Sequence, residues 1–365
     1  MNTPPLLLYL VNVDWFFLSH RLPLALAAKE AGYDVWVACA DTGQGEKIRE
    51  AGLHFIPVPF SRSGTKLLAE LRAMLSVFRV YRRIRPQLVH QVTIKPVLYG
   101  SIIARLFFRK MKVINAVTGL GFTFTEAKRK SLLSGLVRAM YRFALKNHNA
   151  TTIFQNPDDL NTFTGAGLIK PGQAKIIKGS GVDCKIFRPA GSATQPPVVL
   201  LASRMIWDKG IAEFATAAGI IKQSGRQVRF VLAGKAEEGI PNAVPEKQLC
   251  DWQEEGLLEW LGHQSDMAGL IAQASIITLP TVYPEGVPKV LIEAAACGKP
   301  IITTNRPGCR EIVRHGINGL LIPANSPEML AESIIFLLDN PSVAAKYGQA
   351  GRQLVLDEFS IEKVI

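Results

Sequence analysis

Residues 276–303 read IITLPTVYPEGVPKVLIEAAACGKPIIT and contain a strand, a loop, a helix and the start of a second strand. The first apolar run, 276–279, is short and uncharged, as expected for a buried strand. A helix is expected at about 288–297, because proline suits a first helical turn and glycine followed by proline is typical of a helix end. A second apolar run starts at Ile301. This order predicts a parallel β-α-β unit.

The same alternation of apolar runs and amphipathic segments continues in both directions along the chain. Expected strands lie at 6–13, 35–40, 55–58, 88–92, 113–117, 152–155, 175–177, 198–202, 230–233, 258–261, 276–279, 301–303 and 319–322. Expected helices lie at 19–31, 66–84, 96–108, 130–147, 210–222, 265–273, 288–297 and 326–338. Continuously apolar strands that alternate with helices indicate parallel sheets covered on both faces. The predicted fold class is therefore α/β, with two doubly wound, Rossmann-like domains facing a cleft.

The expected domain boundary is residues 188–197, which are rich in proline, glycine and small polar residues, as linkers are. This boundary gives an N-terminal domain at 1–187 and a C-terminal domain at 198–349. The last residues, about 350–365, are expected to be helical and to pack back on the first domain.

Composition excludes several classes of protein. The chain has 365 residues, of which 48% are hydrophobic and 20% charged, so it can form buried cores and is not expected to be disordered. No uncharged apolar run reaches the roughly 18 residues that a membrane-spanning helix needs. The apolar start contains Asn12 and Asp14 with no preceding basic residue, which argues against a signal peptide. Five cysteines without a CxxC pair favour a reduced, cytoplasmic setting.

Charge is distributed unevenly between the two halves. Residues 1–190 contain 27 basic and 11 acidic residues, whereas residues 191–365 contain 15 and 19. Within 60–146 there are 18 basic residues and two acids, Glu70 and Glu126. The first half is therefore expected to face an anionic partner, for which a membrane surface, a phosphorylated lipid and nucleic acid are the candidates.

Two loops of the second half carry residues suited to bind a nucleotide. The loop before the 288–297 helix leads into a helix start, where backbone N–H groups favour a phosphate or a sugar hydroxyl. Glu293 lies in an apolar part of that helix and needs a polar partner; a ligand ribose would supply one, and an exposed position or an arginine partner is the alternative. Arg204 and Lys209 flank the loop after the 198–202 strand and would suit a diphosphate, or would be two solvated surface cations.

Together these loops resemble the retaining nucleotide-sugar glycosyltransferases of family 4, which have the GT-B fold. The resemblance rests on a Glu-x7-Glu pair, Glu285 and Glu293, and on an Arg-x4-Lys-Gly element that comprises Arg204, Lys209 and Gly210. The segments 179–183, 308–311 and 318–321 also look similar to that family, so the resemblance covers nearly the whole chain.

The resemblance implies roles for the matching residues of the second half. Arg204 and Lys209 would neutralise the diphosphate as it leaves, in place of a metal, since the sequence has no Asp-x-Asp motif. Glu285 would hold the transferred sugar, and Glu293 the ribose. The remaining expected donor-binding residues are Gly286, Val287, Pro288, Lys289, Gly262 and His263. No cofactor is implied, because the nucleotide-sugar is a substrate.

In the first half, the resemblance implies an acceptor side. His20 and Arg21 are similar to a Phe-x-x-His-Arg segment of bacterial transferases that act on lipid-linked oligosaccharides, with ordinary polar residues at a helix start as the alternative. Thr118 also belongs to the expected acceptor side and stands where many relatives have a histidine, so the chain departs from the family at this position. Gly119 and Gly121 belong to a Gly-Leu-Gly that resembles that of a subgroup of N-acetylgalactosaminyltransferases acting on undecaprenyl-diphosphate-linked saccharides, with a simple tight turn as the alternative. His90 and Lys95 lie near the end of another expected strand and complete the expected acceptor side; the alternative is that both are ordinary polar residues at the surface.

Two basic segments, 62–85 and 128–146, contain many aliphatic residues between their lysines and arginines. Such segments fit docking on anionic lipid, although core-facing apolar residues with solvated charges would give a similar pattern. Nucleic acid is not expected as a partner, because its binding favours aromatic residues among the basic ones.

The sequence therefore predicts a metal-independent, retaining glycosyltransferase on the cytoplasmic face of the inner membrane. It would move an N-acetylhexosamine or hexose from a UDP-sugar to a polyprenyl-diphosphate-linked saccharide, for O-antigen, capsule or glycoprotein glycan. The alternatives are a soluble GT-B epimerase or phosphorylase, and a non-catalytic nucleotide-sugar-binding protein.

Overall fold

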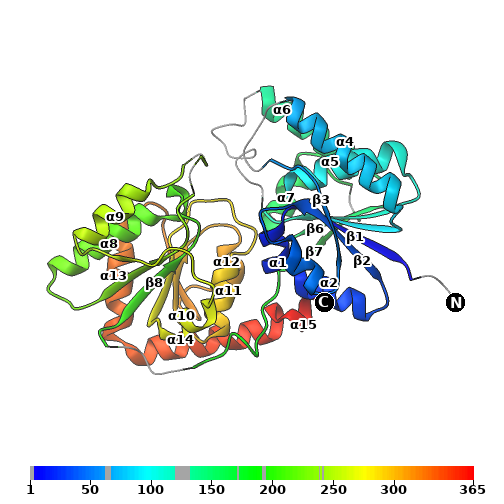
Figure 1. Cartoon of the computed structure of the whole chain (residues 1–365). Coiled ribbons are helices and arrows are strands. Elements are labelled where there is room, and N and C mark those ends of the chain that lie inside the picture. The colour runs from blue at the N-terminus through cyan, green and yellow to red at the C-terminus, as the bar shows by residue number, and fades with distance from the viewer. Residues whose placement is uncertain are drawn as a thin grey trace. The chain divides into compact units, whose positions relative to one another are not determined.

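The computed structural model describes residues 4–61, 67–119, 132–170, 172–190, 195–237, 239–240 and 242–365. These residues form two compact units (Figure 1). Unit 1 comprises Met1–Ser180 together with Val364 and Ile365, and unit 2 comprises Gly181–Lys363. Each unit is built on its own parallel sheet.

The sheet of unit 1 has seven strands in the order β3-β2-β1-β4-β5-β6-β7. All strand pairs are parallel. The strands are β1 (Leu6–Val13), β2 (Asp34–Ala40), β3 (His54–Pro57), β4 (Leu88–Val92), β5 (Lys112–Val117), β6 (Ala150–Phe154) and β7 (Ala174–Ile176). The strand order reverses between β1 and β4, and ligands of open α/β sheets bind at the carboxyl ends of the strands at such a point.

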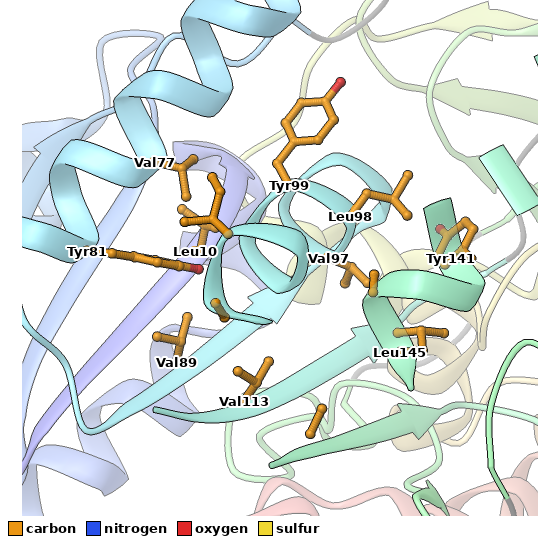
Figure 2. Packing of buried hydrophobic residues seen from close by; sticks show 14 of the residues in the cluster. Leu10, Val77, Tyr81, Val89, Val97, Leu98, Tyr99, Val113, Tyr141 and Leu145 are labelled. Atoms are coloured by element: carbon orange, nitrogen blue, oxygen red, sulfur yellow. The ribbon is translucent and has the colours of Figure 1, made fainter. Parts of the chain in front are cut away.

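Helices cover both faces of this sheet. They are α1 (Asp14–His20), α2 (Leu22–Glu30), α3 (Gly45–Glu50), α4 (Leu67–Ile84), α5 (Ile94–Phe107), α6 (Leu132–Leu145) and α7 (Pro157–Gly165). On one face, side chains of α4, α5 and α6 pack on strand residues (Figure 2). Val97 of α5 and Leu145 of α6, for example, belong to the same buried cluster as Val89 and Val113 of the sheet. Residues of α1, α2 and α3 form a second buried cluster with Leu7, Tyr9 and other strand residues.

The sheet of unit 2 has six parallel strands in the order β10-β9-β8-β11-β12-β13. The strands are β8 (Val198–Ala202), β9 (Arg229–Ala233), β10 (Glu259–Trp260), β11 (Ile276–Leu279), β12 (Ile301–Thr304) and β13 (Gly319–Ile322). The helices are α8 (Ile211–Gln223), α9 (Glu246–Glu254), α10 (Met267–Gln273), α11 (Lys289–Ala296), α12 (Cys309–Ile312), α13 (Pro327–Asp339), α14 (Pro341–Leu354) and α15 (Ile361–Val364). Here the strand order reverses between β8 and β11, which places the loops after these two strands at the expected ligand-binding point.

The predicted fold class, two doubly wound parallel α/β sheets, is confirmed. The division into units falls after Ser180, before the expected linker at 188–197, of which residues 191–194 lie outside the described part. The C-terminal tail is grouped with unit 2 up to Lys363, and Val364 and Ile365 are grouped with unit 1. Within unit 2 the tail is fixed by Arg352, whose guanidinium donates to the backbone oxygens of Cys184, Phe187 and Ala296 at 3.2, 2.8 and 2.7 Å.

Among the described residues, no helix combines the length and the apolar character that a membrane crossing requires.

Candidate functional site

The loops after β8 and β11 are joined at a single backbone oxygen. The carbonyl of Asp208 accepts hydrogen bonds from the Thr281 hydroxyl at 2.9 Å and from the N–H groups of Val282 and Tyr283 at 2.8 and 3.1 Å. Because β8 and β11 are neighbours in the sheet, these two loops meet at the point of strand-order reversal. The local backbone is therefore fixed where a ligand of this fold is expected.

The three predicted catalytic side chains, those of Arg204, Lys209 and Glu285, lie in these loops. Lys209 and Glu285 form an ion pair, with side-chain exposures of 11% and 14%. The ring of Tyr283 lies 5.1 Å from the Lys209 ammonium and 5.6 Å from the Arg204 guanidinium, within the range of cation–π attraction. Two cations and a carboxylate are thus gathered around one aromatic ring.

Two glycines bring these loops close to neighbouring backbone. Gly210 has φ of 79° and Gly308 has φ of 80°, a region that favours glycine. A Cβ at Gly210 would overlap the carbonyl oxygen of Pro280, and a Cβ at Gly308 would overlap that of Gly286. The backbone around Glu285 is therefore shaped by a close contact that no other residue type permits at position 308.

The predicted donor-binding residues at the start of α11 follow directly. Gly286, Val287 and Pro288 are buried, and Pro288 is the residue before the first helical position, Lys289. Lys289 forms an ion pair with Glu293 one turn later, at 3.4 Å between Nζ and Oε1. The expected helix is confirmed, and its regular part is Lys289–Ala296.

Glu293 is 7% exposed and lies on the buried side of α11. Burial raises the pKa of its carboxyl above the ordinary value, and the ion pair with Lys289 offsets this in part. Burial is the larger of the two effects, so the carboxylate is less well stabilised in the fold than in water.

Gly262 and His263 lie apart from this group. They follow β10, which is separated from β8 by β9. Gly262 accepts a hydrogen bond from the N–H of Gly234, at 2.7 Å, and has φ of 64°, while His263 is exposed. The structure therefore brings Arg204, Lys209 and Glu285 together and places Gly262 and His263 two strands away.

In unit 1, three of the predicted acceptor-side residues lie around the point where its strand order reverses. His20 ends α1 and stacks on Phe16, with 4.2 Å between ring centres. Arg21 separates α1 from α2 and is buried. His90 lies on β4 and stacks on Tyr9 of β1, with 5.1 Å between ring centres. Arg21 and His90 line the same cavity.

The other predicted acceptor-side residues are placed differently. Lys95 of α5 donates to Glu70 of α4 at 2.6 Å and to the backbone oxygen and hydroxyl of Ser61 at 2.9 Å each. It therefore ties two helices together. Thr118 and Gly119 are half-buried in the loop after β5, and Gly121 lies outside the described residues.

Comparison with known families assigns both halves of the chain to the same class of enzyme. Residues 7–156 match the family model described as glycosyl transferase 4-like, and residues 183–354 match that of glycosyl transferases group 1. The chain is a group 1, family 4 glycosyltransferase. Two independent models cover the two units in the expected order, which confirms the family that the loop motifs indicated.

Relatives of this glycosyltransferase span most of its length. It is 26% identical over 347 residues to an N,N'-diacetylbacillosaminyl-diphospho-undecaprenol α-1,3-N-acetylgalactosaminyltransferase of Campylobacter jejuni, covering 89% of each chain. It is 23% identical to a UDP-Gal:α-D-GlcNAc-diphosphoundecaprenol α-1,3-galactosyltransferase of Escherichia coli, covering 91% of this chain and 86% of the relative.

Solved structures confirm the GT-B fold of the glycosyltransferase. Sucrose-phosphate synthase from Thermosynechococcus elongatus superposes with a TM-score of 0.81 at 20% identity and covers 99% of this chain and 96% of its own. The Anabaena protein HepE, solved with UDP-glucose, superposes with a TM-score of 0.79 at 19% identity. The superposition covers 98% of this chain and 96% of HepE.

Sequence reasoning missed two parts of the glycosyltransferase site. Tyr283 contacts both cations, and the Asp208 carbonyl joins the loops. Tyr283 could have been noticed as an aromatic residue two positions before Glu285, whereas a backbone carbonyl has no signal in the sequence. In the part of the chain that the structure describes, no three histidine, cysteine, aspartate or glutamate side chains are grouped as metal ligands would be.

Replacing Glu293 with glutamine is expected to raise the melting temperature of the glycosyltransferase at pH 8 more than at pH 4.5. The folded-state pKa of Glu293 lies above its unfolded value, so the ionised carboxylate costs stability that grows as pH rises through this window. If the carboxylate also binds a ribose, affinity for UDP falls about tenfold in the same variant. Melting curves at the two pH values and calorimetric titration with UDP measure both effects. A melting temperature that falls at pH 8 would contradict this prediction.

Proposed function

We propose that this glycosyltransferase moves a hexose or an N-acetylhexosamine, with retention, from a UDP-sugar to a polyprenyl-diphosphate-linked saccharide. The observation that carries the proposal is the group of Arg204, Lys209 and Glu285 around Tyr283, at the point of strand-order reversal in unit 2. Two relatives that cover nearly the whole chain are named for transfer to undecaprenyl-diphosphate-linked sugars, and HepE was solved with UDP-glucose. The product would enter O-antigen, capsule or glycoprotein glycan.

In the proposed reaction, the bond between the anomeric carbon and the donor phosphate breaks, and a bond to an acceptor hydroxyl oxygen forms on the same face. The hydroxyl proton passes to the leaving diphosphate. Arg204 and Lys209 would stabilise the negative charge that develops on this leaving group, because fixed cations in a site with little water act strongly on developing charge. Such front-side attack needs no protein nucleophile.

In this proposal, Lys209 and Glu285 each bind the donor as well as each other. A bound diphosphate would share the Lys209 ammonium, and the Glu285 carboxylate would accept hydrogen bonds from sugar hydroxyls. Both side chains are largely buried, so removing either partner leaves an uncompensated charge. The pair therefore holds both groups in place before the donor arrives.

The surface of α4 supports a membrane-bound acceptor. Leu67, Leu71 and Leu75 follow each other at four-residue steps and are 72%, 53% and 46% exposed, and Arg79 and Arg83 continue the same row. Leu68 beside them is 82% exposed. These leucines project to solvent, whereas Val77 and Tyr81 of the same helix face the core.

Helix α6 repeats this combination on a smaller scale. Leu136 and Phe143 are 59% and 40% exposed, and Arg142 is exposed beside them. An apolar row flanked by arginines fits the interface of an anionic bilayer, where apolar contact and charge attraction add. We therefore place the enzyme on the cytoplasmic face of the inner membrane as a peripheral protein. Residues 62–66 and 128–131 of the predicted basic segments lie outside the described part.

Substituting Leu67, Leu68 and Leu71 together with serine is expected to weaken binding to phosphatidylserine vesicles at least tenfold, because each exposed leucine loses up to about 1.5–3 kcal/mol of apolar burial. Flotation of vesicles with the protein measures the bound fraction. Ile317→Ser, a change at a 58% exposed position of unit 2, is the matched control and should leave binding unchanged. Equal flotation of the triple variant and the wild type would refute the proposal that the exposed leucines of α4 bind the membrane.

The proposal is tested by incubating the protein and a panel of UDP-sugars with an undecaprenyl-diphosphate-linked saccharide. Transfer of one sugar with retained anomeric configuration is the expected result. Conversion of the UDP-sugar into its epimer in the absence of an acceptor would favour an epimerase. Release of a sugar phosphate when a glycan is incubated with inorganic phosphate would favour a phosphorylase. Binding of a UDP-sugar without turnover on any acceptor would favour a non-catalytic binding protein.

A further inference from the structure

Unit 1 contains a small cavity that holds a buried arginine. The cavity has a volume of about 40 Å³, and a water molecule needs at least about 10–15 Å³, so there is room for a few waters or one small oxyanion. It is lined by Arg21, Leu24, His90, Ala116, Val117, Ile153, Gln155, Ile177, Gly179 and Val364. Most of these residues are apolar, so a charged group placed among them lies in an environment of low polarity.

Arg21 has few partners for so buried a cation. The residue is 6% exposed, and one terminal nitrogen donates to the backbone oxygen of His20 at 3.0 Å. Its Nε is buried and has no hydrogen-bond partner, and among the described residues no carboxylate forms an ion pair with Arg21. Burial lowers its pKa to about 10, and Tyr9 opposes this in part. An arginine buried without an anion is costly, unlike Arg352 of unit 2, which donates to three carbonyl oxygens.

His90, which lines the same cavity, also has a buried nitrogen without a hydrogen-bond partner. It is 6% exposed, and its Nε2 is buried without a hydrogen-bond partner. Burial and the nearby Arg21 charge lower its pKa to about 3, so the ring is neutral at physiological pH. A neutral imidazole can donate one hydrogen bond, and the stacking of His90 on Tyr9 fixes the plane of the ring. Arg21 and His90 therefore come from different elements, line one small cavity and each have a buried nitrogen without a hydrogen-bond partner.

We propose that Arg21 and His90 form a binding site for one phosphate group in unit 1, separate from the donor site of unit 2. A guanidinium presents its N–H groups as a planar fork that matches phosphate oxygens, and an apolar lining strengthens such charge-assisted bonds. The source of the phosphate is an isoprenoid diphosphate, an assignment that rests on the proposed function, since that acceptor carries its diphosphate next to the sugar. Free inorganic phosphate could occupy the same site, and the test below distinguishes it from an isoprenoid diphosphate.

The test measures binding by calorimetry with saturating UDP present, so that the donor site is occupied. The probes are inorganic phosphate and farnesyl diphosphate, a soluble isoprenoid diphosphate. Arg21→Met is expected to weaken binding of both probes by about 10- to 100-fold, the usual effect of losing charge-assisted hydrogen bonds. Arg21→Lys keeps the charge without the fork and is expected to show an intermediate loss.

Stability separates a binding role from a structural one. Arg21→Met is expected to keep or raise the melting temperature, because it removes a buried charge that has no anion. Arg352→Met is the matched control. It is expected to lower the melting temperature, because three carbonyl oxygens lose their hydrogen-bond donor, and to leave phosphate binding unchanged.

Each outcome bears on the proposal. Weaker binding by Arg21→Met with retained stability supports the site, and tighter binding of farnesyl diphosphate than of phosphate supports the lipid as source. Equal affinity for both probes assigns the site to free phosphate and contradicts the isoprenoid source. Unchanged phosphate affinity in Arg21→Met, or loss of folding in both Arg21 variants, overturns the site. A protein that binds phosphate but not UDP would instead contradict the proposed function.

Discussion

Sugar transfer is expected to fall by about 10²- to 10³-fold when Lys209 is replaced with methionine, the usual effect of removing one preorganised group that stabilises developing charge. Lys209 is buried, forms an ion pair with Glu285 and lies 5.1 Å from the centre of the Tyr283 ring. Its ammonium therefore acts on a leaving diphosphate with little screening by water. Initial rates with a UDP-sugar and a lipid-linked acceptor, together with calorimetric titration of UDP, measure the effect, and UDP affinity should fall as well.

Lys299→Met is the matched control for this prediction. Lys299 is also a partly buried lysine of unit 2, but it donates to the carbonyl of Ala272, at 2.7 Å, beyond the carboxyl end of α11. Its loss should change stability without changing the transfer rate of the folded protein. A Lys209→Met enzyme that turns over within threefold of the wild type would exclude Lys209 from the reaction.

Gly308→Ala is expected to destabilise unit 2 by about 3 kcal/mol or more and to abolish most of the transfer activity. A non-glycine residue at a positive φ costs about 1–3 kcal/mol, and the new Cβ would also overlap the carbonyl oxygen of Gly286. The backbone of Glu285 and Gly286 would have to move, which displaces the carboxylate from Lys209. For a unit of this size the melting temperature should fall by roughly 6–12 °C.

Gly316 is a matched control within the same unit. It has φ of 74°, close to that of Gly308, but a Cβ there would meet no atom within 4 Å. Gly316→Ala should therefore show the strain alone, about 1–2 kcal/mol, with transfer activity retained. Calorimetric melting and initial rates compare the two variants. Similar losses of activity in both would mean that the contact between Gly308 and Gly286 does not shape the site.

The fold was readable because buried parallel strands are continuously apolar. Runs such as 198–202 and 276–279 stand out from their amphipathic neighbours, and the strands β8 and β11 match them. The donor loops were predictable for a related reason. They follow these strands directly and contain glycine and proline at positions where the backbone must turn, so Arg204, Lys209 and Glu285 could be placed at one edge of one sheet.

The acceptor side was harder to predict, because its contacts join residues far apart in the sequence. Lys95 looked like a cation at a strand end, but its partner Glu70 lies 25 positions away on another helix. Nothing in the sequence shows that Arg21 and His90 share a cavity, since Arg21 lies between α1 and α2 and His90 lies on β4. The exposure of Leu67 and Leu71 could not be predicted either, because the same spacing of leucines would suit a helix face packed on the core.

Hydrogen–deuterium exchange with and without UDP tests most directly that the loops after β8 and β11 bind the donor. The account predicts slower exchange at residues 203–210 and 281–290 when UDP is present, and no such protection in Lys209→Met. Protection by UDP that is absent from both loops and confined to segments of unit 1, such as 88–96, would contradict it.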